Sequence, residues 1–278
     1  MPELPEVETV RKGLEKLVKN KKIKNVQVLW PKIIEQPEVP IFEATLIGET
    51  IESIGRRGKF LIFHLSHYEM ISHLRMEGKY QYFEKEEPID KHTHVIFSFE
   101  DGSQLRYHDV RKFGRMTIVE KGASNTYKGI LKLGPEPLPD LFLLKDFTVG
   151  LQKSHKAIKP LLLDQKLVTG LGNIYVDEAL WEAKIHPEQP ADSLRPKEIK
   201  LLRQAIIDVL SRAVEAGGTT IRSYLNALGE SGSFQVALHV YGQTGEACVR
   251  CQTPIVKTKV AQRGTHYCPT CQKLRIPK

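Results

Sequence analysis

The four cysteines of this 278-residue chain, which are its only ones, lie near its C-terminal end in the pattern C-x2-C-x16-C-x2-C. They are Cys248, Cys251, Cys268 and Cys271. This spacing is typical of a tetrahedral site in which each C-x-x-C turn donates two thiolates to one Zn²⁺ ion. Two disulfide bonds are the alternative, but a reducing cytoplasm disfavours them, and a chain of this length can bury a core without cross-links. Because the protein supplies all four ligands, the predicted zinc ion is structural.

The segment between the two cysteine pairs, QTPIVKTKVAQRGTHY, alternates apolar and basic residues and predicts a β-hairpin with Gly264 in its turn. Residues 248–278 contain seven Lys or Arg and no Asp or Glu. One zinc ion with four thiolates contributes −2, so the module keeps about five positive charges. A cationic hairpin suits a phosphate backbone, and Arg263 would project from its tip. The alternative for Arg263 is an ordinary solvated side chain.

The net charge of the whole chain, +8, favours a polyanionic partner such as nucleic acid or an anionic membrane surface. No apolar run approaches the ~20 residues that cross a bilayer. The acidic N-terminus also lacks the apolar stretch of a signal peptide. We therefore expect a cytoplasmic protein that does not enter a membrane.

The residue pattern divides the chain into a β-rich part, a proline-rich linker, a helical part and the cysteine module. Apolar residues at helical spacing predict a helix from Leu4 through Leu17. Short β-branched and aromatic runs then predict a β-sandwich or barrel, with strands at Ile23–Leu29, Thr50–Ile54, Lys59–Leu65, Met70–Arg75, His94–Phe99 and Arg115–Val119. After the prolines of GPEPLPDLF (134–142), helical spacing returns in 179–185 and 198–218. We expect boundaries at 1–133, 134–150, 151–237 and 238–278.

Three basic stretches place cations beside apolar or aromatic residues, namely RRGKF (56–60), SHLRMEGKY (72–80) and YHDVRKFG (107–114). Each alone fits an ordinary half-buried strand. Together they suit a DNA surface on which cations hold phosphates and apolar side chains enter the base stack. A fourth stretch, TGLGNIYVDEALW (169–181), is a Gly-rich turn before a helix, whose backbone N–H groups could hold a phosphate, although many helices begin this way.

These stretches, taken together and in order, resemble one family along the whole chain. The resemblance is carried by PELPEVETV, HLRMEGKY, DVRKFG, GPEPL, GLGNIYVDEALW, GGTTIRSY and QRGTHYC within the cysteine module. The chain resembles the bacterial formamidopyrimidine-DNA glycosylases. The resemblance implies an α+β multidomain fold with an N-terminal helix and β-sandwich, a helix-two-turn-helix domain and a C-terminal zinc-ribbon β-hairpin finger.

The activity that the resemblance implies is base excision repair. It is the removal of oxidised purines, chiefly 8-oxoguanine paired with cytosine and formamidopyrimidines, followed by β,δ-elimination at the abasic site. A helix start alone does not explain Pro2 and Glu3. In the family the initiator Met is removed and the N-terminal proline nitrogen is the nucleophile, so Pro2 is expected to form a Schiff base and Glu3 to donate a proton. Lys59 would serve the first elimination, and Arg263 would hold the phosphate released in the second.

Further roles implied by the resemblance concern contact with DNA. Met76, Arg111 and Phe113 are expected to fill the space left by the everted base. The other expected DNA contacts are His73, His92, Asn173 and Tyr241. For His92 and Tyr241 the alternative is packing in the protein.

The lesion pocket is expected to comprise Glu6, Glu77, Thr219, Arg222 and Tyr224. The last three belong to a segment, 219–237, that would close over the everted base. In KSHKAIKP (153–160), a lysine is expected to contact DNA, and Lys153 and Lys156 both remain candidates. His108 has no assigned role.

Two other functions share many of these features. One is that of the endonuclease VIII-like enzymes, a sister group that prefers oxidised pyrimidines. Those enzymes carry a Gly in this N-terminal stretch, whereas Leu4 of this chain favours the purine-specific branch. A DNA-binding protein that senses lesions without catalysis is the alternative from another class, but Pro2, Glu3 and Lys59 argue against it. The resemblance also implies a monomer whose partner is double-stranded DNA with an oxidised purine or an abasic site.

Overall fold

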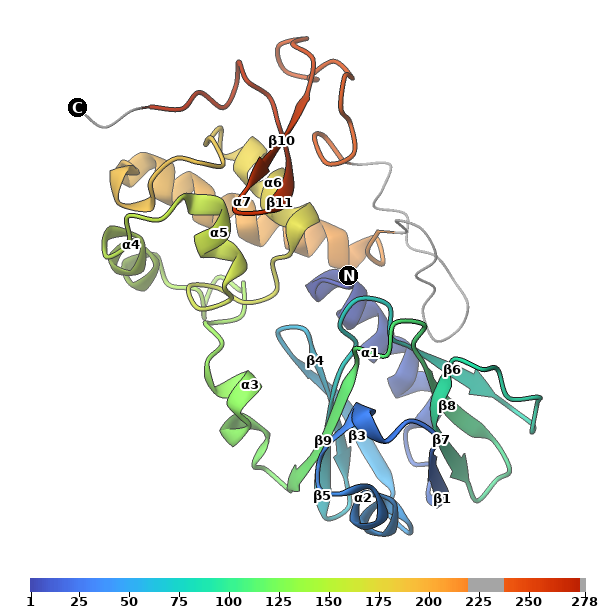
Figure 1. Ribbon diagram of the computed structural model, residues 1–278. Helices are drawn as coiled ribbons and strands as arrows, with labels where there is room; N and C mark the ends of the chain where they lie inside the picture. The colour runs from blue at the N-terminus through green and yellow to red at the C-terminus, as the bar shows by residue number, and fades with distance from the viewer. Residues whose placement is uncertain (220–237, 276–278) are drawn as a thin grey trace. The chain divides into compact units, whose positions relative to one another are not determined.

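A computed structural model describes residues 1–219 and 238–275, and Figure 1 shows their helices and strands. The described residues form two compact units. The first contains Met1–Leu131 together with 217–219, and the second contains Lys132–Ala216 together with 238–275. Within these residues, no helix is both long enough and apolar enough to cross a membrane.

The first unit begins with helix α1 (Leu4–Val18), which follows the apolar spacing of the sequence. Its buried apolar face consists of Leu4, Val7, Val10, Leu14 and Val18. This face packs toward strand β3 (Ile51–Arg57), and the Arg11 guanidinium donates to the Ile54 carbonyl oxygen at 3.2 Å. Helix α1 is therefore fixed to this sheet.

Two sheets form the expected β-sandwich of the first unit. One sheet has the order β2 (Ile34–Gln36), β9 (Arg115–Glu120), β5 (Tyr68–His73), β4 (Phe60–Leu65) and β3. The other has the order β1 (Ile23–Val28), β7 (Thr93–Phe99), β8 (Gln104–His108) and β6 (Lys79–Phe83). Neighbouring strands are antiparallel except β2 and β9. The short helices are η1 (Pro31–Ile33), α2 (Val39–Leu46), η2 (Ser124–Thr126) and α3 (Lys128–Leu131).

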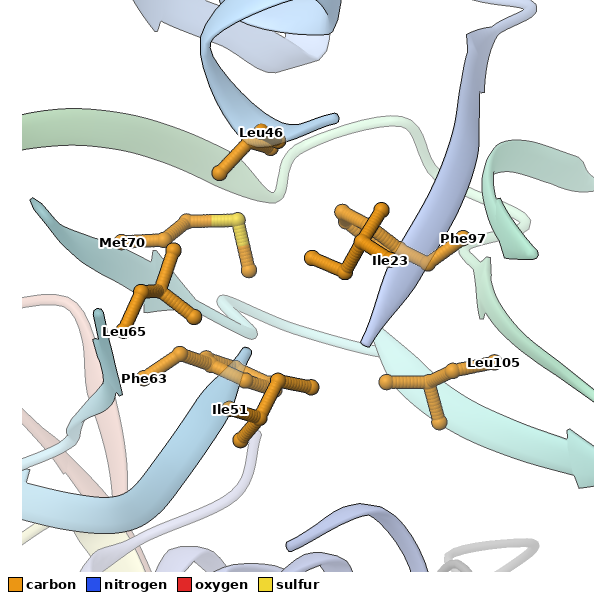
Figure 2. A pocket seen from close by; sticks show the side chains of 8 residues that line it. All are labelled: Ile23, Leu46, Ile51, Phe63, Leu65, Met70, Phe97 and Leu105. Carbon is orange, nitrogen blue, oxygen red and sulfur yellow. The ribbon is translucent and has the colours of Figure 1, made fainter. Parts of the chain in front are cut away.

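Apolar side chains from both sheets meet in one core. A cavity of about 10 Å³ lies within it (Figure 2), lined by Ile23, Leu46, Ile51, Phe63, Leu65, Met70, Phe97 and Leu105. A cavity of this size is at the lower limit for one water molecule and offers it no polar partner. It is a small packing gap in the core and not a binding site.

All six strands expected from the sequence are present, but β2, α2, β6 and β8 were not expected. Strand β8 shows the reason most clearly, because a charged residue lies at its centre. The Arg106 side chain is buried and donates hydrogen bonds to the Gln104 side chain and to the carbonyl oxygens of Glu87 and Pro88. These bonds satisfy a guanidinium group that would otherwise not be buried.

The second unit contains the helices α4 (Leu144–Gln152), α5 (Ile158–Leu163), α6 (Asn173–Glu182), η3 (Ala191–Ser193) and α7 (Pro196–Glu215). Their apolar faces share one core. Helix α4 begins inside the range expected to be a linker, 134–150, and ends just beyond it; it buries Phe147 and Leu151. Helix α7 ends just before Gly217 and Gly218, whose φ angles of +76° and +79° are those of a helix stop.

The expected hairpin of the cysteine module is formed by β10 (Val256–Val260) and β11 (Arg263–Tyr267). The expectation that Gly264 forms its turn is wrong, because Gly264 lies within β11, opposite Lys259. Ala261 and Gln262 form the turn with φ angles of +46° and +64°, as a two-residue hairpin turn with the right twist requires. Arg263 is the first residue after this turn and is exposed.

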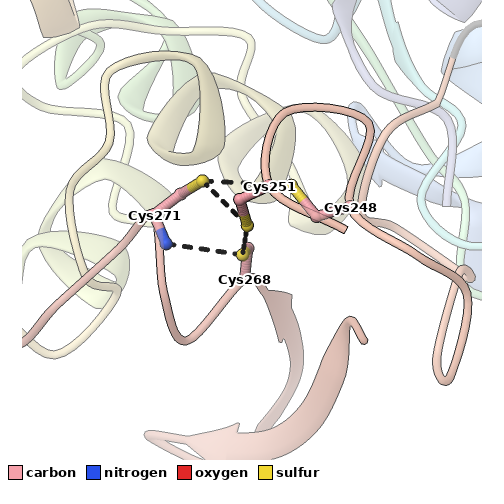
Figure 3. A group of neighbouring side chains, drawn as sticks. All are labelled: Cys248, Cys251, Cys268 and Cys271. Atoms are coloured by element: carbon pink, nitrogen blue, oxygen red, sulfur yellow. Dashed lines mark hydrogen bonds between the residues drawn. The ribbon is translucent and has the colours of Figure 1, made fainter. Parts of the chain in front are cut away.

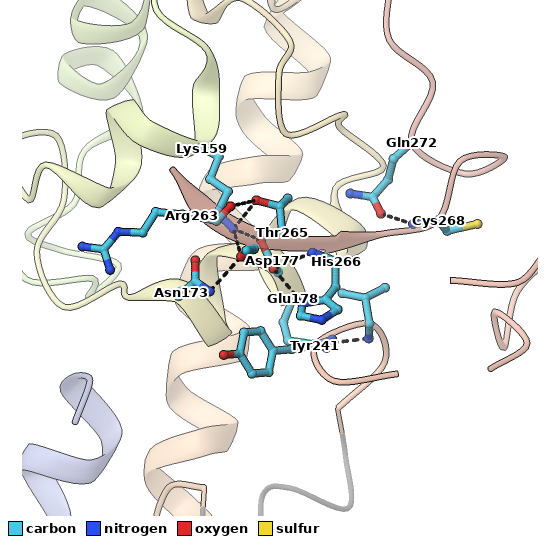
Figure 4. Close-up of polar contacts among 12 residues, drawn as sticks. Lys159, Asn173, Asp177, Glu178, Tyr241, Arg263, Thr265, His266, Cys268 and Gln272 are labelled. Carbon is cyan, nitrogen blue, oxygen red and sulfur yellow. Dashed lines mark hydrogen bonds and ion pairs between the residues drawn. The ribbon is translucent and has the colours of Figure 1, made fainter. Parts of the chain in front are cut away.

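A buried ion pair fastens this hairpin to the helices of the second unit (Figure 4). The Lys159 ammonium lies 2.7 Å from Asp177 Oδ1 and also donates to Thr265 Oγ1 at 2.8 Å and to the Gly264 carbonyl oxygen at 3.0 Å. The other Asp177 oxygen accepts the His266 N–H at 2.9 Å. Because both charged side chains are fully buried, each depends on these partners.

We expect Lys159→Ala to lower the free energy of unfolding by about 3–5 kcal/mol, because it leaves the Asp177 carboxylate buried without its cation. Urea unfolding followed by circular dichroism measures the change. Lys156→Ala is the control, since that side chain is exposed on the same segment and should cost less than about 0.5 kcal/mol. Similar losses for both variants would contradict this role of Lys159.

Candidate active site and metal centre

The N-terminal residues Pro2 and Glu3 are buried at the start of α1, whereas Met1 is 47% exposed. The Glu3 N–H donates to Glu6 Oε2 at 2.8 Å. The other oxygen of Glu6 accepts the Thr219 N–H at 2.8 Å and the Thr219 hydroxyl at 3.3 Å. One carboxylate thus links the first helical turn to the residue at which the expected lesion-closing segment begins.

This link explains why a glycine precedes Thr219. Gly218 has a φ of +79°, and a Cβ there would lie 2.8 Å from Glu6 Oε1. Any larger residue would therefore push against the carboxylate that the link uses. The structure brings Pro2, Glu3, Glu6 and Thr219 together, while Arg222 and Tyr224 lie outside the described residues.

Lys59 follows Gly58 in the turn between β3 and β4, and only 7% of Lys59 is exposed. Gly58 has a φ of +56°, which suits the tight turn. Arg56 fixes the turn, because it donates to the Glu8 carboxylate of α1 and to the Gly58 carbonyl oxygen, each at 2.8 Å. The RRGKF stretch therefore holds one lysine in place against the sheet.

His73 lies at the end of β5, opposite Phe60, and its ring packs edge-on against the Phe60 ring. Its Nδ1 accepts the Arg75 N–H at 2.9 Å, so a neutral His73 carries its proton on Nε2. Burial, together with the smaller effect of the positive charges of Arg75 and Lys59, lowers the pKa of His73 to about 3. His73 is thus a neutral hydrogen-bond donor.

The loop after His73 carries Met76 and Glu77. The Gly78 N–H donates to the Leu74 carbonyl oxygen at 3.0 Å, which closes the loop. Met76 is half-buried and Glu77 is exposed. A second loop, between β8 and β9, carries Arg111 and Phe113 on the surface.

Phe113 is 46% exposed, and the Arg111 guanidinium lies 4.8 Å from the centre of its ring. His92 is half-buried and packs edge-on against His108, whose Nε2 lies 3.0 Å from Asp90 Oδ1. His92 is therefore partly packed against His108 and partly exposed. Its exposed part is accessible to a ligand.

In the second unit, Asn173, Tyr241 and Arg263 are grouped at the N-terminal end of α6 (Figure 4). The Asn173 side-chain amide donates to the Gly264 carbonyl oxygen at 2.9 Å. The Glu178 carboxylate accepts the Val240 and Tyr241 N–H groups, each at 2.9 Å. Lys153 and Lys156 are both exposed, and both remain candidates for the contact with DNA. Lys159 is not a candidate, because it is buried in its ion pair with Asp177.

The positioning residues Asp177, Glu178 and Lys159 were missed by the sequence reasoning. The sequence gives little indication of their role, because charged residues on a helix usually face solvent. Asp109, in the DVRKFG stretch, was also not assigned. An Asp that precedes a turn often accepts N–H groups of the following residues, and this preference could have drawn attention to it.

The four cysteine sulfur atoms converge, as Figure 3 shows, and lie within 4.8 Å of one another. The Sγ atoms of Cys248 and Cys271 are 3.9 Å apart. Cys251 Sγ lies 3.5 Å from both Cys268 Sγ and Cys271 Sγ. A disulfide bond needs about 2.05 Å, so the cysteines are not paired. A tetrahedral ion with Zn–S bonds of about 2.3 Å separates its ligands by roughly 3.8 Å, and the observed distances fit this geometry.

We expect NMR titration of the His73 ring to show a midpoint near its pKa of about 3, with the Nε2–H tautomer above it. An unfolded chain protonates His73 near 6.5, so the folded state loses stability as pH falls from about 6.5 toward 3. His73→Gln assigns the signal by removing it. A His73 midpoint near 6.5 would contradict the burial argument.

We expect one zinc ion per chain by elemental analysis of the purified protein. Cys248→Ser should lose zinc and loosen the hairpin, because three ligands hold the ion less tightly and the metal stabilises the fold of such a module. Val249→Ser is the matched control, since that neighbouring side chain is 65% exposed and makes no ligand. Full zinc content in Cys248→Ser would contradict the four-cysteine assignment.

Comparison with known proteins gives three family matches along the chain. Residues 1–116 match the formamidopyrimidine-DNA glycosylase N-terminal domain, residues 133–224 its H2TH domain, and residues 245–274 a zinc finger found in FPG and IleRS. The zinc-finger match and the cysteine geometry together assign one structural zinc ion to the four cysteines.

Relatives cover almost the full length. The chain is 74% identical over 275 residues to the formamidopyrimidine-DNA glycosylase of Enterococcus faecalis, covering 99% of this chain and 98% of that protein. It is 48% identical to a Lactococcus lactis FPG mutant in a crystal structure with Fapy-dG-containing DNA, with a TM-score of 0.94 and coverage of 98% and 100%. A complex of Lactococcus lactis Fpg with abasic-site DNA gives a TM-score of 0.93 at 48% identity, with coverage of 98% and 99%. The chain belongs to the formamidopyrimidine-DNA glycosylase family.

Proposed function

We propose that this chain is a bifunctional DNA glycosylase and abasic-site lyase that removes 8-oxoguanine and formamidopyrimidines from double-stranded DNA. The observation that carries the proposal is the buried pair Pro2 and Glu3, held in place through Glu6. The names of the relatives, and their structures with Fapy-dG and abasic-site DNA, support this activity.

In the first step the exposed Met1 is removed, which frees the Pro2 nitrogen as a secondary amine. An α-amine has a pKa near ~8, so a useful fraction is unprotonated at neutral pH. Its lone pair attacks C1′ of the damaged nucleotide, the glycosidic bond breaks, and the base leaves with the bonding electrons. Glu3 donates a proton to the sugar ring oxygen, and the ring opens. The nitrogen gives up its own proton, which neutralises the departing base.

The product is an iminium ion between Pro2 and the open sugar. Because a secondary amine leaves no N–H on the iminium nitrogen, the ion stays cationic and acidifies the C2′ protons. Loss of one such proton breaks the C3′–O bond and releases the 3′ phosphate. A second elimination, with loss of the C4′ proton, breaks the C5′–O bond and releases the 5′ phosphate. Water then releases the sugar fragment from Pro2. We assign the first elimination to Lys59 and the phosphate of the second to Arg263.

Each unit contributes residues that suit a DNA backbone. In the first unit, Lys59 supplies a cation and the neutral His73 supplies an N–H donor. In the second unit, Asn173 and Arg263 lie beside the start of α6, and Tyr241 lies close by. The zinc ion would stabilise the module whose hairpin carries Arg263, and it takes no part in the chemical steps.

The remaining assigned residues handle the lesion and its partner base. Met76, Arg111 and Phe113 fill the space of the everted nucleotide, and His92 contacts the strand nearby. Glu6, Glu77 and Thr219 contribute to the lesion pocket with Arg222 and Tyr224. We also propose that the protein acts as a monomer and that it works in the cytoplasm. The cytoplasmic location is supported by its bacterial relatives being named as DNA glycosylases.

We expect Glu3→Gln to slow excision of 8-oxoguanine opposite cytosine by about a hundredfold or more, because the general acid is lost. DNA binding should remain, since the side chain keeps its size. Single-turnover gel assays measure excision, and gel shifts measure binding. The control is Glu52→Gln, because the Glu52 side chain is 49% exposed on the same unit. Normal excision by Glu3→Gln would contradict the assignment of the acid.

A further inference from the structure

The loop that carries Arg111 and Phe113 is organised by one buried carboxylate. Asp109 is fully buried, and its Oδ1 accepts the Arg111 N–H at 3.0 Å. Its Oδ2 accepts the N–H groups of Phe113 at 3.0 Å and Gly114 at 2.8 Å. Three backbone N–H groups of this loop thus have the same side chain as their acceptor.

The backbone of Asp109 is itself held by the neighbouring strand. Its N–H donates to the His92 carbonyl oxygen at 3.0 Å, and its own carbonyl oxygen accepts from His94 Nε2 at 2.7 Å. A carbonyl can only accept, so His94 is the donor. Asp109 therefore joins the loop to the start of strand β7.

The loop has a conformation that needs such support. Lys112 has a φ of +59°, in the left-handed region that residues with a Cβ rarely adopt. Its ammonium lies 3.9 Å from the centre of the Trp30 ring, so Lys112 turns toward Trp30. Arg111 and Phe113 remain exposed on the surface.

Tyr107 connects this loop to the loop that carries Met76. The buried Tyr107 hydroxyl lies 3.4 Å from Asp109 Oδ2. A Cβ on Gly78 would come within 2.1 Å of this hydroxyl, and a Cβ on Gly114 within 1.7 Å. The loop after β5 and the loop after β8 therefore both pack against the Tyr107 hydroxyl oxygen.

We propose that Asp109, together with Tyr107, is a positioning residue that preforms Met76, Arg111 and Phe113 as one wedge before DNA binds. The inference rests on the proposed function, in which these three residues replace the everted nucleotide. A wedge whose backbone is already ordered loses less conformational entropy on binding, so the affinity for a distorted duplex is higher. Asp109 itself touches neither the sugar nor the base.

The first test uses the free protein and needs no DNA. In Asp109→Asn one of the two acceptor oxygens becomes an NH₂ group. The amide hydrogens that lose their acceptor, either that of Arg111 or those of Phe113 and Gly114, should exchange with solvent about tenfold faster or more. Asp101→Asn is the matched control, because Asp101 accepts the Ser103 N–H at 3.0 Å in a turn that carries no wedge residue. Unchanged exchange at all three amides, Arg111, Phe113 and Gly114, would overturn the proposal, whatever the activity of the variant on DNA.

The second test compares two DNA substrates. On a duplex with 8-oxoguanine opposite cytosine, Asp109→Asn should lower kcat/KM about tenfold. On a single-stranded abasic oligonucleotide, which has no partner base to support, strand cleavage should change less than about twofold. Tyr107→Phe should show the same split to a smaller degree, and it replaces Asp109→Asn if that variant does not fold.

Equal losses on the two substrates would indicate general damage to the fold and would overturn the positioning role. The absence of any loss on the duplex would overturn it as well. If the wild-type protein cleaves neither substrate, the proposed function fails, and the exchange experiment still decides whether Asp109 orders the loop.

Discussion

The carboxylate of Glu6 makes the interaction on which the candidate active site depends. One of its oxygens accepts the Glu3 N–H and the other accepts the Thr219 N–H. A chain terminus is ordinarily poorly ordered unless it is tied down. Here the tie lies within the first helical turn, so Pro2 and Glu3 are buried in a defined position. A nucleophile at the end of a chain can be useful only if its position is fixed in this way.

Much of the fold was predictable, because periodic apolar residues report directly on a buried face. Leu4, Val7, Val10 and Leu14 predicted α1, and the cysteine spacing predicted the converging thiolates. Strand β8 was not predictable in the same way, since its central Arg106 is buried by hydrogen bonds to distant carbonyl oxygens. Such partners come together only in the folded chain and leave no local pattern in the sequence.

The site shows the same division. The candidate site residues could be predicted from sequence motifs, whereas the buried residues that position them could not. Asp109 and Asp177 look like surface acids in the sequence, but each is fully buried and accepts backbone N–H groups. The turn at Ala261 and Gln262 was misplaced onto Gly264 because glycine is the usual left-handed residue. The pairing register of β10 and β11 determines which residues form the turn, and this register depends on both strands together.

The central claim is that the nitrogen of Pro2 becomes joined to the sugar of the damaged nucleotide. Borohydride reduction of the protein with abasic-site duplex DNA, followed by proteolysis and peptide mass spectrometry, tests it most directly. We predict a reduced deoxyribose adduct on the nitrogen of Pro2 in a chain that lacks Met1. An adduct confined to a lysine, or full strand cleavage by a chain that keeps Met1, would contradict the claim.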